Sequence, residues 1–142
     1  MVNADHSSSC MCPAGDMHGT GAPIGFVICI PHLNARIYHA GDTNVTSEMG
    51  ITEELYHPNI LMLPIGDRFT MGPEGAALAC SNFLKSAAYI IPMHYETFPL
   101  LSGTWEGFKA ELERRNVDTK LLVHSPDHRD GPELEIDQLR LI

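Results

Sequence analysis

The sequence predicts a layered α/β fold, because short apolar runs typical of buried strands alternate along the chain with amphipathic segments typical of helices. A chain of 142 residues can bury a sizeable core, and its hydrophobic share of 44% is in the usual globular range. No internal repeat, low-complexity tract or linker divides the sequence. We therefore interpret residues 1–142 as a single domain.

The first third of the chain predicts a loop followed by a pair of strands. Residues 7–24 are rich in serine, glycine and proline, which is a loop composition. Residues 25–30 predict a buried strand and residues 35–40 predict the next one. Residues 31–34 contain a proline and an asparagine and are expected to join the two strands as a hairpin.

The middle of the chain predicts a helix, a strand and a second helix. The first helix, at residues 46–56, is expected to stop before Pro58. The continuous apolar run at residues 59–63 is typical of a buried parallel strand. Residues 73–85 predict the second helix, with Pro73 at its first position and Glu74 near the positive end of its dipole. Its expected apolar stripe consists of Ala76, Ala79, Cys80, Phe83 and Leu84.

The last third continues the alternation of strands and helices. Residues 87–93 predict a strand, and Thr104 is expected to cap a helix that runs to about Asn116. The apolar face of that helix is Trp105, Phe108 and Leu112, and its expected ion pair is Glu111 with Arg115. Further predictions are a strand at 120–124, a turn at 127–131 and a short edge strand at 133–136.

Charge and composition exclude several classes of function. The chain has 18 acidic and 9 basic residues, for a formal net charge of -9, which argues against nucleic acid or an anionic membrane as partner. No apolar run is long enough to span a membrane. The polar start lacks the pattern of a secretory signal, so we expect a cytoplasmic protein.

The four cysteines fit a reducing compartment. Cys29 and Cys80 lie in apolar patterns and are expected to be buried thiols. Cys10 and Cys12 are too close together for a standard structural disulfide. Together with His6 they could bind zinc, but the C-x₂-C pair of common zinc modules is absent, and we interpret them as ordinary loop cysteines.

Two residues stand at the expected carboxyl ends of strands. Asp42 follows the strand at 35–40, and His94 follows the strand at 87–93. Ligands of α/β sheets usually bind at that edge, and both side chains are of types that bind divalent metals. The alternative for Asp42 is an Asx-turn or a helix cap, and the alternative for His94 is an ordinary hydrogen-bonding role.

Several motifs in consistent order resemble the metallo-β-lactamase superfamily, in its branch of small metal-dependent hydrolases with lactonase-like relatives. The motifs are His6-Ser7-Ser8, Pro23-Ile24-Gly25-Phe26, Tyr38-His39-Ala40-Gly41-Asp42-Thr43, Leu63-Pro64-Ile65-Gly66, Phe69-Thr70-Met71-Gly72-Pro73-Glu74 and Ile91-Pro92-Met93-His94-Tyr95. The H-x-H-x-D-H motif of that family is absent. The chain therefore resembles the C-terminal half of the domain. The resemblance implies half of a four-layer αββα sandwich, with a mixed sheet and helices on one face.

The resemblance also implies a metal site. His6, Asp42 and His94 match three of the family's ligands, with Asp42 as the carboxylate that bridges two metals. Two imidazoles and one carboxylate suit zinc, with manganese or iron as alternatives, and a bound cation lowers the pKa of its water. A second cation would lack nearly all of its ligands. We therefore expect at most one divalent ion per chain, and the resemblance leaves open whether the isolated chain holds it.

Neighbouring residues extend the expected site. The catalytic candidates are Asp42 and Tyr95. The Tyr95 hydroxyl could donate a hydrogen bond to a substrate oxyanion. His39 either orients a ligand or faces the opposite side of its strand. Thr70 and Met71 lie in a loop that packs beneath the site in the family, or else form a helix cap and core filler. The remaining histidines are expected to be solvated: His18, His32, His57, His124 and His128.

Two functions from different classes remain. The first is a metal-dependent hydrolase of an ester, lactone or phosphoester, acting on a small molecule through an incomplete metal site. The second is an inactive half-domain that serves as a structural or interaction module, as a homodimer or with a partner chain. Its apolar sheet face is expected to be lined by Val27, Ile37, Leu61, Leu63 and Ile90, or by their strand neighbours. A nucleotide-binding protein is disfavoured, because no glycine-rich phosphate motif is present.

Overall fold

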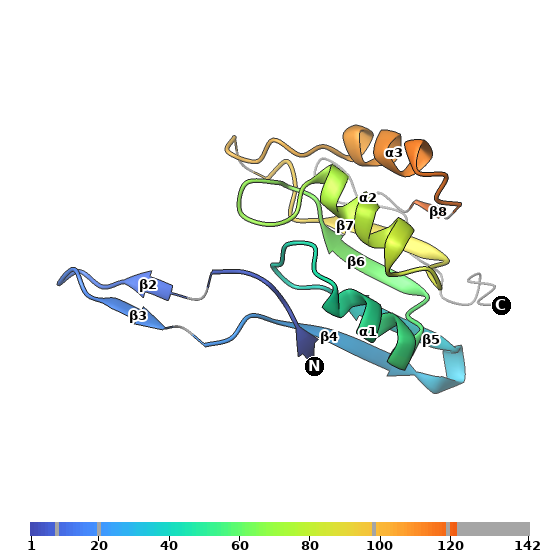
Figure 1. Ribbon diagram of the computed structural model, residues 1–142, viewed down its shortest axis with the longest axis horizontal. Helices are drawn as coiled ribbons and strands as arrows, with labels where there is room; N and C mark the ends of the chain where they lie inside the picture. Colours follow the sequence, from blue (N-terminus) through green and yellow to red (C-terminus); the bar gives the residue numbers. More distant parts are fainter. Residues whose placement is uncertain (8, 20, 98, 119, 122–142) are drawn as a thin grey trace.

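A computed structural model describes residues 1–7, 9–19, 21–97, 99–118 and 120–121 (Figure 1). In that part of the chain a six-stranded sheet has the order β1-β4-β5-β6-β7-β8, and a separate hairpin, β2–β3, extends away from it. None of the described helices combines the length and the apolar character that a membrane span requires.

The main sheet is mixed, as predicted. Its strands are β1 (Val2–Asn3), β4 (Ile24–Ile30), β5 (Ala35–His39), β6 (Ile60–Pro64), β7 (Tyr89–Met93) and β8 (Lys120–Leu121). The β1–β4 and β4–β5 pairs are antiparallel, whereas β5–β6, β6–β7 and β7–β8 are parallel. The helices are α1 (Glu48–Tyr56), α2 (Pro73–Asn82) and α3 (Trp105–Arg114), with a 3₁₀ turn, η1 (Pro31–Leu33), between β4 and β5.

The three helices pack on one face of this sheet (Figure 1). Tyr38, Leu61 and Ile90 are direct neighbours across β5, β6 and β7, so their side chains share that face. They are buried together with Met49 of α1 and Phe108 of α3. The predicted stripe of α2 lies in the same core, with Phe83 partly buried against it.

The opposite face of the sheet was expected to carry Val27, Ile37, Leu61, Leu63 and Ile90, or else their strand neighbours. Leu61, Leu63 and Ile90 are fully buried beneath the helices, and Val27 packs against the same core, so the first of these two alternatives is wrong for these four. Their strand neighbours occupy the other face, where Ile28 pairs with Ile37 and Phe26 pairs with His39. The physical reason is the two-residue period of a strand, which exchanges the faces when the assignment shifts by one residue.

Three further expectations need correction. Residues 7–24 are not all loop, because they contain β2 (Ser9–Met11) and β3 (Met17–Gly19). The strand at 25–30 is not buried, since Phe26 and Ile28 are about half exposed, and the expectation of a buried thiol at Cys29 is wrong for the same reason, because Cys29 is exposed. The second helix ends at Asn82 rather than at Lys85, because the amides of Phe83 and Leu84 both donate to the Ala79 carbonyl oxygen and close the helix.

In the last third of the chain, the predicted cap at the N-terminus of α3 is confirmed. The Gly107 amide donates to Thr104 Oγ1 at 3.1 Å, and Arg115 Nε lies 3.7 Å from Glu111 Oε2. Of the strand predicted at 120–124 the described part is β8. The predicted turn at 127–131 and the edge strand at 133–136 lie outside the described residues.

Candidate active site

The carboxyl ends of three parallel strands, β5, β6 and β7, lie at one edge of the sheet. Asp42 follows β5, Gly66 follows β6 and His94 follows β7. The ladder continues past the strand ends, because the Ala40 amide donates to the Met62 carbonyl oxygen and the Ile65 amide donates to the Met93 carbonyl oxygen, each at 3.0 Å. The three following turns are therefore held in register beside one another.

Asp42 and His94 meet at this edge. Asp42 Oδ1 lies 3.8 Å from His94 Nε2, and the two side chains are 54% and 30% exposed. Two ligands of a tetrahedral zinc ion lie about 3.5 Å apart, given metal–ligand bonds of about 2.0–2.2 Å. The pair therefore fits a single cation with little movement, and remains open to solvent for a water or a substrate.

The N-terminal segment is tied to the Asp42 turn by Thr43. The Asp5 amide donates to Thr43 Oγ1 at 2.8 Å, and the Asn44 amide donates to the Asp5 carbonyl oxygen at 2.7 Å. Both bonds fix the residue that precedes His6. As a result, His6 and Asp42 line one pocket, with Ser7, Gly21, Ala22, Pro23 and Ile24 as its other walls.

The hydrogen bond of the His6 ring suits metal binding, but the position of the ring relative to Asp42 and His94 does not. Its Nδ1 lies 2.8 Å from the Ser7 carbonyl oxygen, to which an Nδ1–H donates, and this leaves Nε2 as the lone-pair atom of a neutral ring. However, among the described residues His6, Asp42 and His94 do not form a group whose ligand atoms all lie within 4.8 Å of one another. The structure brings Asp42 and His94 together and places His6 at the same pocket but farther away.

Thr43 is completely buried, and no pattern in the sequence singles out its hydroxyl. Thr43→Val keeps the shape of the side chain but leaves the part-buried Asp5 amide without its acceptor. We expect the free energy of unfolding to fall by about 0.5–1.5 kcal/mol. Urea denaturation measures this loss, and Thr97→Val at an exposed position is the matched control. Equal free energies of unfolding for the two variants would show that the hydrogen bond from the Asp5 amide to Thr43 Oγ1 does not contribute to stability.

His94 is held by very close backbone packing. Its φ is 55°, in the left-handed region, and its buried Nδ1 has no hydrogen-bond partner in the described part of the chain. A Cβ at Gly66 would lie 2.0 Å from the His94 carbonyl oxygen, so only glycine fits there. The Leu63-Pro64-Ile65-Gly66 motif thus positions a candidate ligand from the neighbouring strand, a role that the sequence alone does not reveal.

His39 shapes the turn that carries Asp42. Its Nδ1 accepts a hydrogen bond from the Gly41 amide at 3.1 Å. Gly41 has a φ of 70°, and a Cβ there would lie 2.5 Å from the Ile24 carbonyl oxygen. The imidazole and the glycine together hold the turn that precedes Asp42, and the His39 side chain lies with Phe26 on the sheet face opposite the helices. A role of His39 in orienting a metal ligand stays a prediction.

Tyr95 is 4% exposed and belongs to the core beneath the helices. Burial raises its pKa, and the nearby Glu96 and Glu106 carboxylates raise it further. Its hydroxyl therefore stays protonated at neutral pH, so it can donate a hydrogen bond and cannot act as a base. Its contact with a substrate stays a prediction.

The loop that contains Thr70 and Met71 packs directly against the Asp42 turn. Both side chains are buried, and the Met71 amide donates to the Thr43 carbonyl oxygen at 2.8 Å. Asp67 closes the other end of this loop, where its Oδ2 accepts from Ser102 Oγ at 2.9 Å. The loop supports the site from below and supplies none of its candidate ligands.

Comparison with known proteins gives a consistent family. A family model described as a beta-lactamase superfamily domain matches residues 1–95. A UPF0173 metal-dependent hydrolase of Chelativorans sp. is 42% identical over 125 residues, which are 88% of this chain and 51% of that protein. The chain thus spans about half the length of the curated relatives it matches.

Solved structures agree. Igni18, a metallo hydrolase from the archaeon Ignicoccus hospitalis, is 35% identical with a TM-score of 0.70, over 91% of this chain and 48% of that one. A Thermotoga maritima protein described as a candidate zinc-dependent hydrolase of the metallo-β-lactamase superfamily is 27% identical with a TM-score of 0.53, over 66% and 47% of the two chains. The chain belongs to the metallo-β-lactamase superfamily and, within it, to the UPF0173 metal-dependent hydrolase family.

Proposed function

We propose that this chain carries one part of a hydrolase metal site, in which Asp42, His94 and His6 hold a single divalent cation. Zinc is the first choice, and manganese or iron are alternatives. The observation that carries the proposal is the 3.8 Å approach of Asp42 Oδ1 to His94 Nε2 at the carboxyl edge of the sheet. The substrates we propose are small esters, lactones or phosphoesters.

The chemistry follows from the donor set. A cation bound here would lower the pKa of a coordinated water and polarise a carbonyl or phosphoryl oxygen. Asp42 and His94 supply its first two ligands, and the Ser7 carbonyl oxygen keeps Nε2 of His6 available as the third. Tyr95 remains protonated and is the candidate donor to a developing oxyanion. Because the sequence has no H-x-H-x-D-H motif, these residues provide for one cation and not for two.

Zinc titration by calorimetry tests the proposal. The protein carries Cys12→Ser, so that a thiol on the β2–β3 hairpin does not add to the signal. We expect at most one weakly bound ion per chain, and affinity at least about tenfold lower after Asp42→Asn or His94→Ala. His32→Ala, at an exposed histidine of η1, is the matched control and should leave binding unchanged. Two tightly bound ions, or no effect of either substitution, would contradict the proposal.

The second candidate function is that of an interaction module, and it rests on the sheet face opposite the helices. Ile24, Phe26 and Ile28 of β4 are 38%, 47% and 48% exposed there. We propose that the sheet with its helices is one half of a four-layer αββα sandwich, and that this face pairs with a second copy of the chain in the cytosol. Exposed apolar side chains clustered on one sheet face are typical of such contacts.

A further inference from the structure

A second cluster of metal-binding side chains lies on the β2–β3 hairpin. A ligand atom from each of Cys12, Asp16 and His18 lies within 4.8 Å of the other two. In the part of the chain that the structure describes, no other group of three or more histidine, cysteine, aspartate or glutamate side chains is so closely spaced. We propose that Cys12, Asp16 and His18 bind zinc or another thiophilic divalent cation.

The register of the hairpin brings the three residues together. Ser9 pairs with Gly19 and Met11 pairs with Met17, so the next position, Cys12, stands opposite Asp16. The Cys12 amide donates to the Asp16 carbonyl oxygen at 2.9 Å. Side chains two residues apart along a strand share a face, which puts His18 beside Asp16.

The turn of the hairpin fixes this register. The Gly15 amide donates to the Cys12 carbonyl oxygen at 2.8 Å, and Gly15 has a φ of 89°, a conformation that favours glycine. The sequence Cys12-Pro13-Ala14-Gly15-Asp16 therefore forms a hydrogen-bonded turn with a candidate ligand at each end. Because residues 7–24 were expected to form a loop, Cys12, Asp16 and His18 were not expected to lie together.

The donor set suits zinc. Thiolate, imidazole and carboxylate are the three zinc ligand types of proteins, and the thiolate disfavours magnesium and calcium. Ligand atoms of a tetrahedral zinc ion lie about 3.5 Å apart, so side-chain movements of about 1 Å close the cluster. Asp16 and His18 are exposed and Cys12 is half-buried, so such movements are unobstructed, and a fourth position remains for water.

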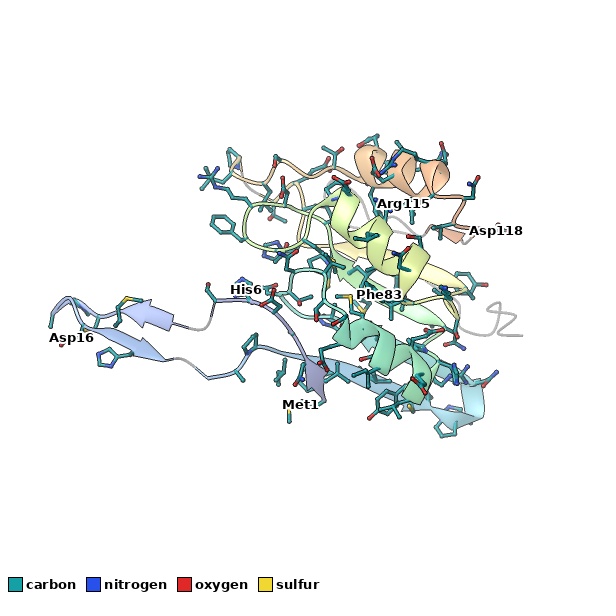
Figure 2. All side chains as sticks on the ribbon, in the orientation of Figure 1. Met1, His6, Asp16, Phe83, Arg115 and Asp118 are labelled. Carbon is teal, nitrogen blue, oxygen red and sulfur yellow. The ribbon has the colours of Figure 1, made fainter. Side chains whose placement is uncertain are left out.

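This cluster is distinct from the site at Asp42 and His94. Figure 2 shows Asp16 at the outer end of the hairpin, whereas His6 lies on the segment that leads from the main sheet to the hairpin. The two candidate sites also differ in chemistry, because only the hairpin cluster contains a thiolate. A two-stranded hairpin is marginally stable by itself, so a cation that links its two strands would stabilise its paired form.

Cobalt titration of the reduced protein is the test, because a thiolate bound to Co²⁺ gives a near-ultraviolet charge-transfer band that histidine and carboxylate ligands do not give. We expect the band to saturate at one equivalent and to disappear when zinc is added. Cys12→Ser should abolish it, and His18→Ala should weaken cobalt binding at least about tenfold.

Two control variants identify the site. Cys29→Ser removes an exposed thiol of β4, and Asp42→Asn alters the other candidate site, and both should leave the band unchanged. The proposal is overturned if wild type shows no band with excess cobalt, if the band survives Cys12→Ser, or if Asp42→Asn removes it. Failure of zinc binding at Asp42 and His94 would leave these results unaltered, so the two proposals are tested separately.

Discussion

Replacing Phe26 and Ile28 together by glutamate is expected to abolish the proposed self-association of this chain, with a dissociation constant raised at least about a hundredfold, or about 2.7 kcal/mol. Both side chains are about half exposed on the sheet face that the helices leave uncovered. Burying a large apolar side chain contributes about 1.5–3 kcal/mol, and a glutamate at the same place would bring an unpaired charge into the contact.

Sedimentation velocity and light scattering over a range of concentrations measure this effect. The matched control is Ile51→Glu with Leu55→Glu on α1, where the two side chains are 52% and 65% exposed but belong to a helix rather than to the open sheet face. That double variant should associate as wild type does. A wild type that stays a compact monomer at high concentration would contradict the prediction, as would equal effects of both double variants.

The open face also shows what the sequence could and could not reveal. β6 is apolar at every position, so its place in the middle of a parallel sheet was predictable, but nothing in Ile60–Pro64 tells which residues face the helices. Which residues of β6 face the helices depends on which sheet face α1 and α2 cover. That face is determined by contacts between segments that are distant in the sequence. Phe26 and Ile28 were therefore expected to be buried, whereas their neighbour Val27 packs under the helices.

The candidate site was predicted in part, because the rule for strand ends is local. Asp42 and His94 follow strands that the apolar pattern locates, and the structure brings them to 3.8 Å. The groups that position them were not predictable in the same way. The buried Thr43 hydroxyl and the close contact of Gly66 with His94 depend on segments distant in sequence.

The hairpin cluster was missed for a different reason. Serine, proline and glycine in residues 7–24 are typical of loops, and that composition outweighed the short alternating pattern of β2 and β3. The signal that could have found it is the symmetry about Ala14, which places Cys12 opposite Asp16 and Cys10 opposite His18. Cys10 and Cys12 were considered as zinc ligands together with His6 instead, and His18 was expected to be a solvated loop residue.

Catalysis by this chain alone is expected to be at least about a thousandfold slower than that of a relative with a complete site, or about 4 kcal/mol of lost transition-state stabilisation. A two-metal hydrolase activates its water between two cations and uses both to stabilise the attacking and leaving oxygens. The proposed ligands Asp42, His94 and His6 would serve one cation, and the sequence has no H-x-H-x-D-H motif for a second. Asp42 would then contact one cation instead of bridging two.

A panel of esters, lactones and phosphodiesters tests this expectation with added zinc or manganese, on wild type, Asp42→Asn and His94→Ala. The Ignicoccus hospitalis hydrolase, which this chain matches over 48% of its length, serves as the positive reference. We expect wild type to turn over no faster than the two variants. Robust hydrolysis that both substitutions abolish would show that one cation on this donor set is sufficient, because Asp42 and His94 would then support the chemistry without a second ion.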